Sequence, residues 1–326
     1  MKQYRFEENY QDTWQALEAL LQQLESKKKK RLASEDFTRF SHLYRQTCYH
    51  YSLAQSRQYS PYLVEKLHDL VMRAHQHFYS KRRFHAWRIF QFIFTDFPVM
   101  VRKNARLLWL SAFLLFGPGI TLGMLCYHDT EFIYTVMSQN QVVEMESMYD
   151  PGNEGEIGRI RGADTDLYMF GHYIQNNISI GFRTFAGGLF FGIGTVATLL
   201  FNGVFIGAVA GHLTQLGYGV TFWSFVSGHS ALELMAICVC GAAGLRLALA
   251  LFAPGRHTRL DALRLASKQA FILVMGGAAM LLAAAFVEAF WSSIRTVAPE
   301  IKYAVGGVFW LLVALYFTLS GRRHGS

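Results

Sequence analysis

The constraint that dominates this sequence is a set of five stretches that are apolar over the length of a membrane span. A helix needs about 20 apolar residues to cross the hydrocarbon core of a bilayer. The stretches are residues 106–126, 184–217, 230–252, 269–291 and 303–320. They are too many and too long to be core helices of a soluble domain. The sequence therefore predicts an all-α, polytopic helical membrane protein with an N-terminal cytoplasmic helical domain.

Charge is distributed unevenly along the chain and indicates which segments lie on the cytoplasmic side. Residues 1–105 carry a net charge of +8, residues 127–181 one of −7, and residues 253–268 one of +3. Because basic loops stay inside, we expect residues 1–105, 253–268 and the tail 321–326 in the cytoplasm and 127–181 outside. The polar start of the chain shows no signal peptide, so the first apolar stretch is expected to act as the insertion signal.

This sidedness requires an even number of crossings, whereas five stretches would give an odd number. We therefore expect residues 184–217 to cross or re-enter twice. The bend is placed at Phe201-Asn202-Gly203, because Asn-Gly is a strong turn signal. The second half, 203–217, has 15 residues and would span only about 22 Å as a helix. It is expected to be a broken or re-entrant segment near residue 202 that packs against protein.

Three helices are predicted ahead of the membrane. The first covers residues 8–33, the second begins at Ser34 as its N-cap, and the third covers 61–79 and is opened by Pro61. Apolar residues recur at helical spacing in each of them. Residues 1–80 are therefore expected to form a helical domain.

The next segment, residues 81–98, interleaves basic and aromatic side chains. This composition is typical of an amphipathic helix that lies in the membrane interface. Nucleic-acid binding would use the same residue types, but the first apolar stretch begins a few residues later, which favours lipid. The expected interfacial residues are Arg82, Arg83, Phe84, Trp87, Arg88 and Phe90.

The remaining connections are predicted from composition. The acidic region after the first span is expected to hold short amphipathic helices, and Thr258 is expected to cap a helix that runs into the fourth apolar stretch. The predicted parts are a cytoplasmic domain (1–80), an interfacial helix (81–98), a first transmembrane helix (99–126), an extracytoplasmic acidic segment (127–183), a transmembrane bundle (184–320) and a cytoplasmic tail (321–326).

A few polar residues stand in or beside the apolar stretches, and all of them except Asn202 lie near the outer face of the predicted topology. They are Asn202, His212, His229, Glu233 and Glu288. Broken helices and intramembrane carboxylates are typical of transport sites, so a transporter or channel with a polar site built from these residues is one hypothesis. No inverted repeat is visible between the halves, which counts against it.

Ser230 and Glu233 offer a simpler interpretation. They have the S-x-x-E spacing of a capping box directly before an apolar run. Ser230 would cap the helix 230–252, and Glu233 would bond back to it. On this interpretation Glu233 has a structural role only, and His229 lies just outside the helix.

Two catalytic classes do not fit these residues. An intramembrane metalloprotease needs H-E-x-x-H, whereas His229 and Glu233 form H-x-x-x-E. That pair offers at most two ligands and would need a third, such as His212 or Glu288. A serine protease interpretation of GHSA at 228–231 lacks a histidine in the last apolar stretch. No enzymatic activity, metal or cofactor is therefore predicted.

Several motifs resemble one family. They are NNI at 176–178, GGLFFGIGTVATLLFNGVFIGAVAGH at 187–212, GHSALELMAICVCGAAGLRL at 228–247 and PGRHTRLDALRLA at 254–266. These stretches look like the stage II sporulation protein M family, and the N-terminal helices resemble its longer, non-sporulating bacterial members. The resemblance implies a multi-pass protein of the bacterial cytoplasmic (inner) membrane with no known enzymatic activity.

The resemblance also implies protein partners. In spore formers, family members act with cell-wall-degrading enzymes; elsewhere they are encoded beside MoxR-type AAA+ ATPases and von Willebrand A-domain proteins. The long basic N-terminal segment favours the second setting. We therefore expect a membrane scaffold or assembly factor, linked to cell-envelope remodelling, that binds membrane lipids and protein partners but no nucleic acid. An oligomer is compatible with the sequence.

Overall fold

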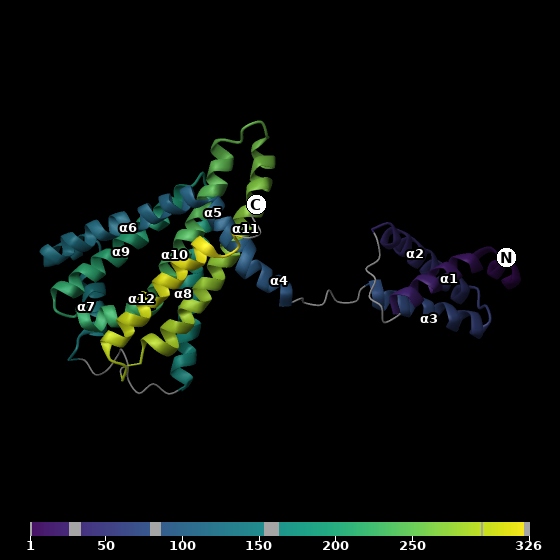
Figure 1. Ribbon diagram of the computed structural model, residues 1–326, viewed down its shortest axis with the longest axis horizontal. Coiled ribbons are helices and arrows are strands. Elements are labelled where there is room, and N and C mark those ends of the chain that lie inside the picture. Colours follow the sequence, from purple (N-terminus) through teal and green to yellow (C-terminus); the bar gives the residue numbers. More distant parts are fainter. Residues whose placement is uncertain (1, 26–33, 79–85, 153–162, 295, 323–326) are drawn as a thin grey trace. The chain divides into compact units, whose positions relative to one another are not determined.

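The computed structural model describes residues 2–25, 34–78, 86–152, 163–294 and 296–322. Within those ranges the chain is helical and contains no strand, as the sequence predicts. It divides into two compact units, Met1–Arg88 and Ile89–Ser326, each of which is described by itself (Figure 1).

The N-terminal unit is a bundle of three helices. They are α1 (Gln3–Glu25), α2 (Ser34–Ser56) and α3 (Pro61–Phe78), close to the predicted positions. Their core holds Trp14, Leu17 and Leu21, which recur at helical spacing in the first predicted helix, and it adds Phe6, because α1 begins earlier than predicted. The side chain of Ser34, the predicted cap, lies outside the described part.

One buried polar pair lies inside that core. His50 of α2 is 4% exposed, and its Nδ1 accepts a hydrogen bond of 3.1 Å from Nε1 of Trp14 in α1. Tyr10 packs on the same imidazole, with ring centroids 4.0 Å apart. Burial lowers the pKa of His50 below its usual value, because a charged imidazolium loses its hydration there.

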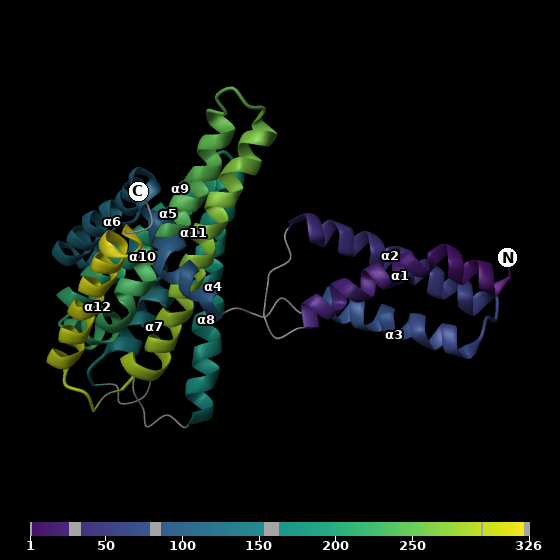
Figure 2. The same ribbon diagram turned by 45° about the vertical axis from the view of Figure 1, so that its right-hand side comes forward.

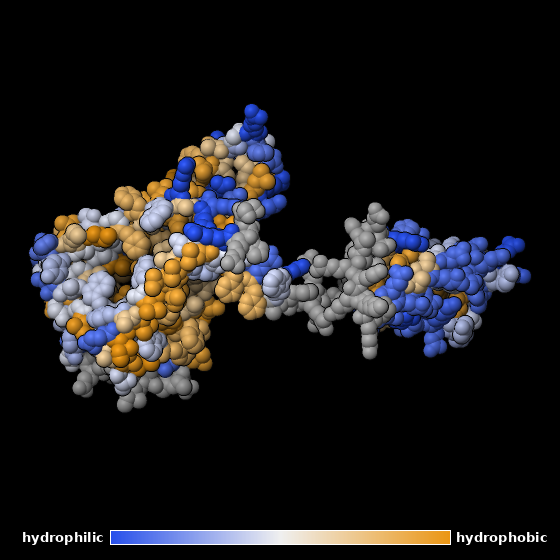
Figure 3. Space-filling model, in the orientation of Figure 1, coloured by the Kyte–Doolittle hydropathy of each residue, from blue (hydrophilic) through white to orange (hydrophobic). Residues whose placement is uncertain are grey.

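The second unit contains five helices that are long and apolar enough to cross a membrane, and all five correspond to predicted stretches. They are α6 (Ala105–His128), α9 (Ile193–Gln215), α10 (Gly219–Phe252), α11 (Arg259–Val287) with its continuation η4 (Glu288–Ser292), and α12 (Pro299–Leu319). Apolar side chains cover much of this unit's surface, whereas the visible surface of the N-terminal unit is largely polar (Figure 3).

The predicted bend near residue 202 is wrong. Helix α9 runs unbroken through Asn202 and Gly203, and Nδ2 of Asn202 donates to the backbone oxygen of Thr198 within the same helix. The turn lies earlier, where η3 (Gly187–Leu189) follows α8 (Ala163–Ala186) and Gly192 adopts φ +79° before α9. Such a left-handed backbone favours glycine.

Helix α8 corrects the predicted topology. The sequence placed most of it in the acidic segment 127–183, but it packs against α9, α10 and α11 within the bundle. Its 24 residues measure about 36 Å, enough to cross the hydrocarbon core. By length α8 is a further long helix of the bundle, but among the described residues only the five helices named above also have the hydropathy of a membrane span.

Shorter helices join the spans. Residues 127–152 form η2 (Thr130–Thr135) and α7 (Gln139–Tyr149), as predicted for short helices there.

The α11 helix begins at Arg259, and Oγ1 of Thr258 accepts from the amide of Asp261, which confirms the predicted cap. The two longest helices, α10 and α11, extend beyond the rest of the unit as a hairpin (Figure 2).

A continuous helical segment precedes α6. It consists of α4 (Ala86–Gln91), η1 (Phe92–Asp96) and α5 (Phe97–Lys103), so the first span begins at Ala105 instead of at the predicted residue 99. Trp87 is 73% exposed and Phe90 is 56% exposed, and the role of both in the interface stays a prediction. Arg82, Arg83 and Phe84 lie outside the described residues.

Glycines bring α6 and α9 into backbone contact. A Cβ built on Gly203 would lie 2.1 Å from the backbone oxygen of Leu115, one on Gly207 would lie 2.0 Å from that of Gly119, and one on Gly211 would lie 2.0 Å from that of Gly123. Small residues at spacing four allow this approach in membranes, where packing replaces the hydrophobic effect between helices.

The first prediction follows from this contact. Gly207→Ala should destabilise the bundle by about 1–3 kcal/mol, because the added methyl group meets a backbone oxygen that cannot rotate away. The matched control is Gly307→Ala on α12, where no atom lies within 4 Å of the added Cβ. Thermal unfolding in detergent, followed by far-ultraviolet circular dichroism, compares the two variants. Equal unfolding midpoints for the two variants would contradict the backbone contact between α6 and α9.

The second prediction concerns pH and the N-terminal unit. Since the pKa of His50 is lowered in the fold, the unfolded chain binds the extra proton first. Stability should be full above about pH 6.5 and should fall as the pH drops below that value, because protonation at Nδ1 breaks the bond from Trp14. Hydrogen exchange of α1 and α2, corrected for intrinsic rates, should show this loss. His50→Gln should abolish the pH dependence, whereas the exposed His42→Gln should keep it.

Candidate functional site

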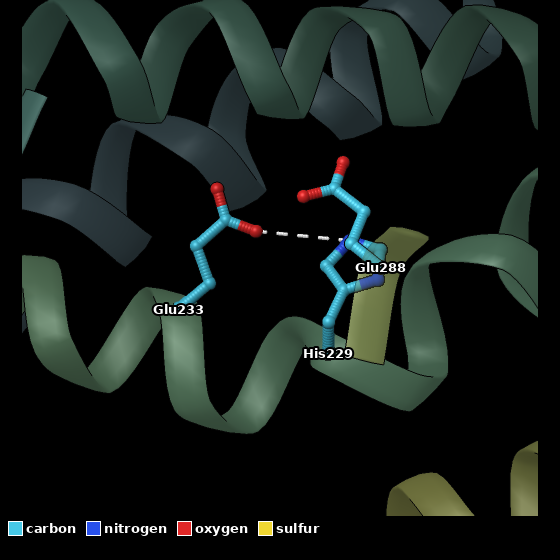
Figure 4. A group of neighbouring side chains, drawn as sticks. All are labelled: His229, Glu233 and Glu288. Atoms are coloured by element: carbon cyan, nitrogen blue, oxygen red, sulfur yellow. Dashed lines mark ion pairs between the residues drawn. The ribbon is translucent and has the colours of Figure 1, made fainter. Parts of the chain in front are cut away.

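A buried polar cluster lies where α8, α10 and η4 meet. His229 and Glu233 are one turn apart on α10, and Glu288 begins η4. Nε2 of His229 lies 3.7 Å from Oε2 of Glu233. One ligand atom from each of the three side chains lies within 4.8 Å of the others, and the side chains face one another (Figure 4).

The predicted capping box at Ser230 and Glu233 is wrong. Helix α10 begins at Gly219, so Ser230 lies inside the helix, where its Oγ donates to the backbone oxygen of Ser227. Phe222 and Phe225 are buried, which explains why the helix continues back past the predicted start. His229 therefore lies on the helix, and its side chain and that of Glu233 are free to meet Glu288.

A second layer of polar groups orients the cluster. Nδ1 of His229 lies 3.0 Å from Oγ of Ser292, and Nδ2 of Asn177 in α8 donates to Oε2 of Glu288 over 3.3 Å. Asn177 and Ser292 are each 1% exposed, and Glu288 is 9% exposed. Each of these polar side chains is therefore held in the interior of the bundle by a partner from another helix.

The backbone at η4 places Glu288 and Ser292 against α10. This five-residue segment is a π-helix at the end of α11, and single π-turns of this kind occur often at functional sites. A Cβ on Gly228 would lie only 3.0 Å from Oγ of Ser292. The absence of a side chain at Gly228 thus permits the approach that brings Ser292 to the neighbouring His229.

Aromatic residues enclose one end of the cluster. Tyr149, the last residue of α7, packs against Phe222 and Phe225 of α10, and its backbone oxygen accepts from Oγ1 of Thr221. Burial, and then the charge of Glu288, raises the pKa of the Tyr149 phenol. Helix α7 is therefore fixed against the first part of α10, next to the turn that carries His229.

The five-residue polar site predicted from the sequence is not assembled. His212 pairs with Glu146 of α7, with Nε2 and Oε1 2.7 Å apart, and Asn202 bonds within its own helix. Only His229, Glu233 and Glu288 come together. Sequence reasoning missed Asn177 and Ser292; the polar pair Asn176-Asn177 inside a helical pattern was the available signal.

The donor atoms of the cluster are two carboxylates and one imidazole. Oxygen and nitrogen donors of these types bind divalent cations such as Zn²⁺. Carboxylates at membrane depth are costly unless they are paired, and for that reason they mark functional positions. The three residues are therefore the candidate site of the bundle, and they are the only residues that meet as a possible metal-ligating group within the described ranges.

Comparison with known proteins gives two matches. The family model for stage II sporulation protein M matches residues 112–293, a region that contains α8 to α11 and the whole buried cluster. A second family model, a domain of unknown function (DUF8413), matches residues 4–80. No curated protein matches, and no solved structure matches.

The first match agrees with the resemblance in the glycine-rich and GHSALELMA motifs. The matched region covers more than half of the chain, and among the described residues the whole chain has five helices with the length and composition of membrane spans. The chain belongs to the stage II sporulation protein M family.

Proposed function

We propose that this protein is a membrane scaffold or assembly factor, linked to cell-envelope remodelling, with no catalytic activity of its own. The observation that carries the proposal is the division of the chain. Residues 1–88 form a compact unit with its own core, separate from the apolar bundle. A folded unit of this kind beside a membrane bundle presents a surface to proteins outside the bilayer.

The proposed partners come from the family resemblance. They are a MoxR-type AAA+ ATPase, a von Willebrand A-domain protein or a cell-wall enzyme. A further surface is available to them at the α10–α11 hairpin, where Arg256 and Arg259 lie near the exposed apolar residues Phe252, Leu260 and Leu265. Basic and apolar groups side by side suit a protein contact.

A transporter or channel is the second candidate, and one observation favours it. Glu233 and Glu288 lie inside a bundle of apolar helices, where carboxylates often line transport pathways. This hypothesis now depends on three residues instead of five, and α9 does not have the broken helix that motivated it. The scaffold proposal is therefore preferred.

The proposed location is the bacterial inner membrane, with both termini and the α10–α11 hairpin in the cytoplasm. The support is the charge pattern: the hairpin turn is basic, and the segment between α6 and α8 is acidic. Counting α8 as a crossing gives six crossings, and both ends of the chain then lie on the same side.

The third prediction tests this sidedness. In a background without native cysteines, His257→Cys in the hairpin turn should resist a membrane-impermeant maleimide in intact cells and should react after permeabilisation. Gln139→Cys, at the exposed start of α7, should react in intact cells. Labelling of position 257 from outside would overturn the proposed orientation.

The fourth prediction tests the scaffold. Affinity purification from native membranes, followed by mass spectrometry, should recover one of the proposed partners with the full chain and should lose it when residues 1–80 are deleted. Glu233→Gln should retain the partner, because that residue lies in the bundle and not in the N-terminal unit. Maleimide labelling of Gln139→Cys in the deletion variant checks that this variant still inserts into the membrane. The proposal fails if the full chain and the deletion variant recover the same set of partner proteins.

A further inference from the structure

The carboxyl groups of Glu233 and Glu288 lie close together in the buried cluster. Among the residues that the structure describes, no lysine or arginine forms an ion pair with Glu233 or Glu288. Lys302 is buried nearby, but its Nζ donates to the backbone oxygen of Ser292 over 2.8 Å. Two carboxylates and one imidazole thus share one site in an environment of low dielectric constant, where unpaired charge is costly.

We propose that His229, Glu233 and Glu288 bind a divalent transition-metal ion, with Zn²⁺ as its representative. A doubly charged cation, two carboxylates and a neutral imidazole make a site of zero net charge. This inference concerns the interior of the bundle, goes beyond the proposed scaffold function and does not require that anything be transported.

The geometry of the donors fits such an ion. In a tetrahedral zinc site the ligand atoms lie about 2.0–2.2 Å from the metal, which places them roughly 3.4 Å from one another. Nε2 of His229 and Oε2 of Glu233 are 3.7 Å apart, and all three donor atoms lie within 4.8 Å of one another. Rotation of the glutamate side chains closes the remaining difference. Three protein ligands leave a fourth position for water.

The orientation of His229 is an independent observation that points to a metal. A histidine that ligates through one ring nitrogen almost always donates from the other to an oxygen atom. Nδ1 of His229 lies 3.0 Å from the Ser292 hydroxyl, so in the tautomer protonated at Nδ1 the ring donates to Ser292 and its Nε2 lone pair is directed at the carboxylates. Glu288 is also held in position by a second residue, because Nδ2 of Asn177 donates a hydrogen bond to its Oε2.

The helices explain why three ligands distant in the sequence meet. His229 and Glu233 have the one-turn spacing that places two ligands on one face of α10. The π-helix η4 turns Glu288 and Ser292 together toward that face, and Gly228 leaves room for it. A bound ion would tie α10 to the end of α11 and would stabilise the folded bundle.

Metal binding by the full-length protein tests the proposal directly. The protein is purified in detergent with a tag that lacks histidine, treated with a chelator and equilibrated with Zn²⁺ alone. We expect one Zn²⁺ per chain by elemental analysis, and an increase in the thermal unfolding midpoint. His229→Gln and Glu288→Gln should lose the bound ion and the increase.

Matched controls separate this site from the other histidines, of which the chain has twelve in all. The exposed residues His172 and Glu300 are replaced by Gln, and these variants should bind Zn²⁺ like the unmodified protein. Ser292→Ala keeps all three ligands and should weaken Zn²⁺ binding by about 10–100-fold, even if the ligand variants fail to fold. An unmodified protein that binds no Zn²⁺, or a Ser292→Ala variant with unchanged affinity, overturns the proposal.

Discussion

The bundle depends on close contact between helix backbones. Lipid chains are as apolar as leucine, so burial of apolar side chains does not drive helices together inside a membrane. At Gly203, Gly207 and Gly211, the backbone of α9 lies directly against carbonyl groups of α6. The same kind of contact recurs where Gly188 meets Gly244 of α10. Glycine is therefore a packing residue at these helix contacts, and it allows α9 and α6 to lie against each other.

This packing also explains how a helix as polar as α8 is accommodated. Its Asn177 would be costly against lipid, but Glu288 of η4 provides a hydrogen-bond partner on the inner side of the bundle. The tight turn at Gly187–Gly192 then leads into α9, where Thr195 donates to the backbone oxygen of Thr184. A polar helix is thus held in place by glycine contacts and by a few buried hydrogen bonds.

Much of the fold could be predicted from the sequence, because hydropathy reports directly on membrane spans. The five apolar helices, the helical N-terminal unit and the cap at Thr258 were found where expected. The even number of crossings inferred from the charge pattern stays a prediction. Hydropathy did not identify α8, because this helix carries polar and charged residues such as Asp164, Asn177 and Arg183. Asn202-Gly203 misled the prediction, since turn statistics from soluble proteins do not describe a glycine that serves helix contact.

The candidate site was predicted only in part, for a related reason. His229, Glu233 and Glu288 are conspicuous because ionisable residues are rare in apolar stretches. Whether they meet depends on helix packing, which separated His212 and Asn202 from them and brought in Asn177 and Ser292. The S-x-x-E pattern suggested that a helix starts at Ser230. The helix instead starts before this pattern, because burial of Phe222 and Phe225 stabilises the earlier helical turns.

The length of α10 has a mechanical consequence. Its 34 residues measure about 51 Å, which exceeds the roughly 30 Å thickness of a bilayer core. The hairpin turn directly follows Phe252, the last residue of the helix that also carries His229 and Glu233. An α-helix without a kink moves as a stiff rod, so a tilt applied at the hairpin turn is also a displacement of His229 and Glu233 relative to Glu288.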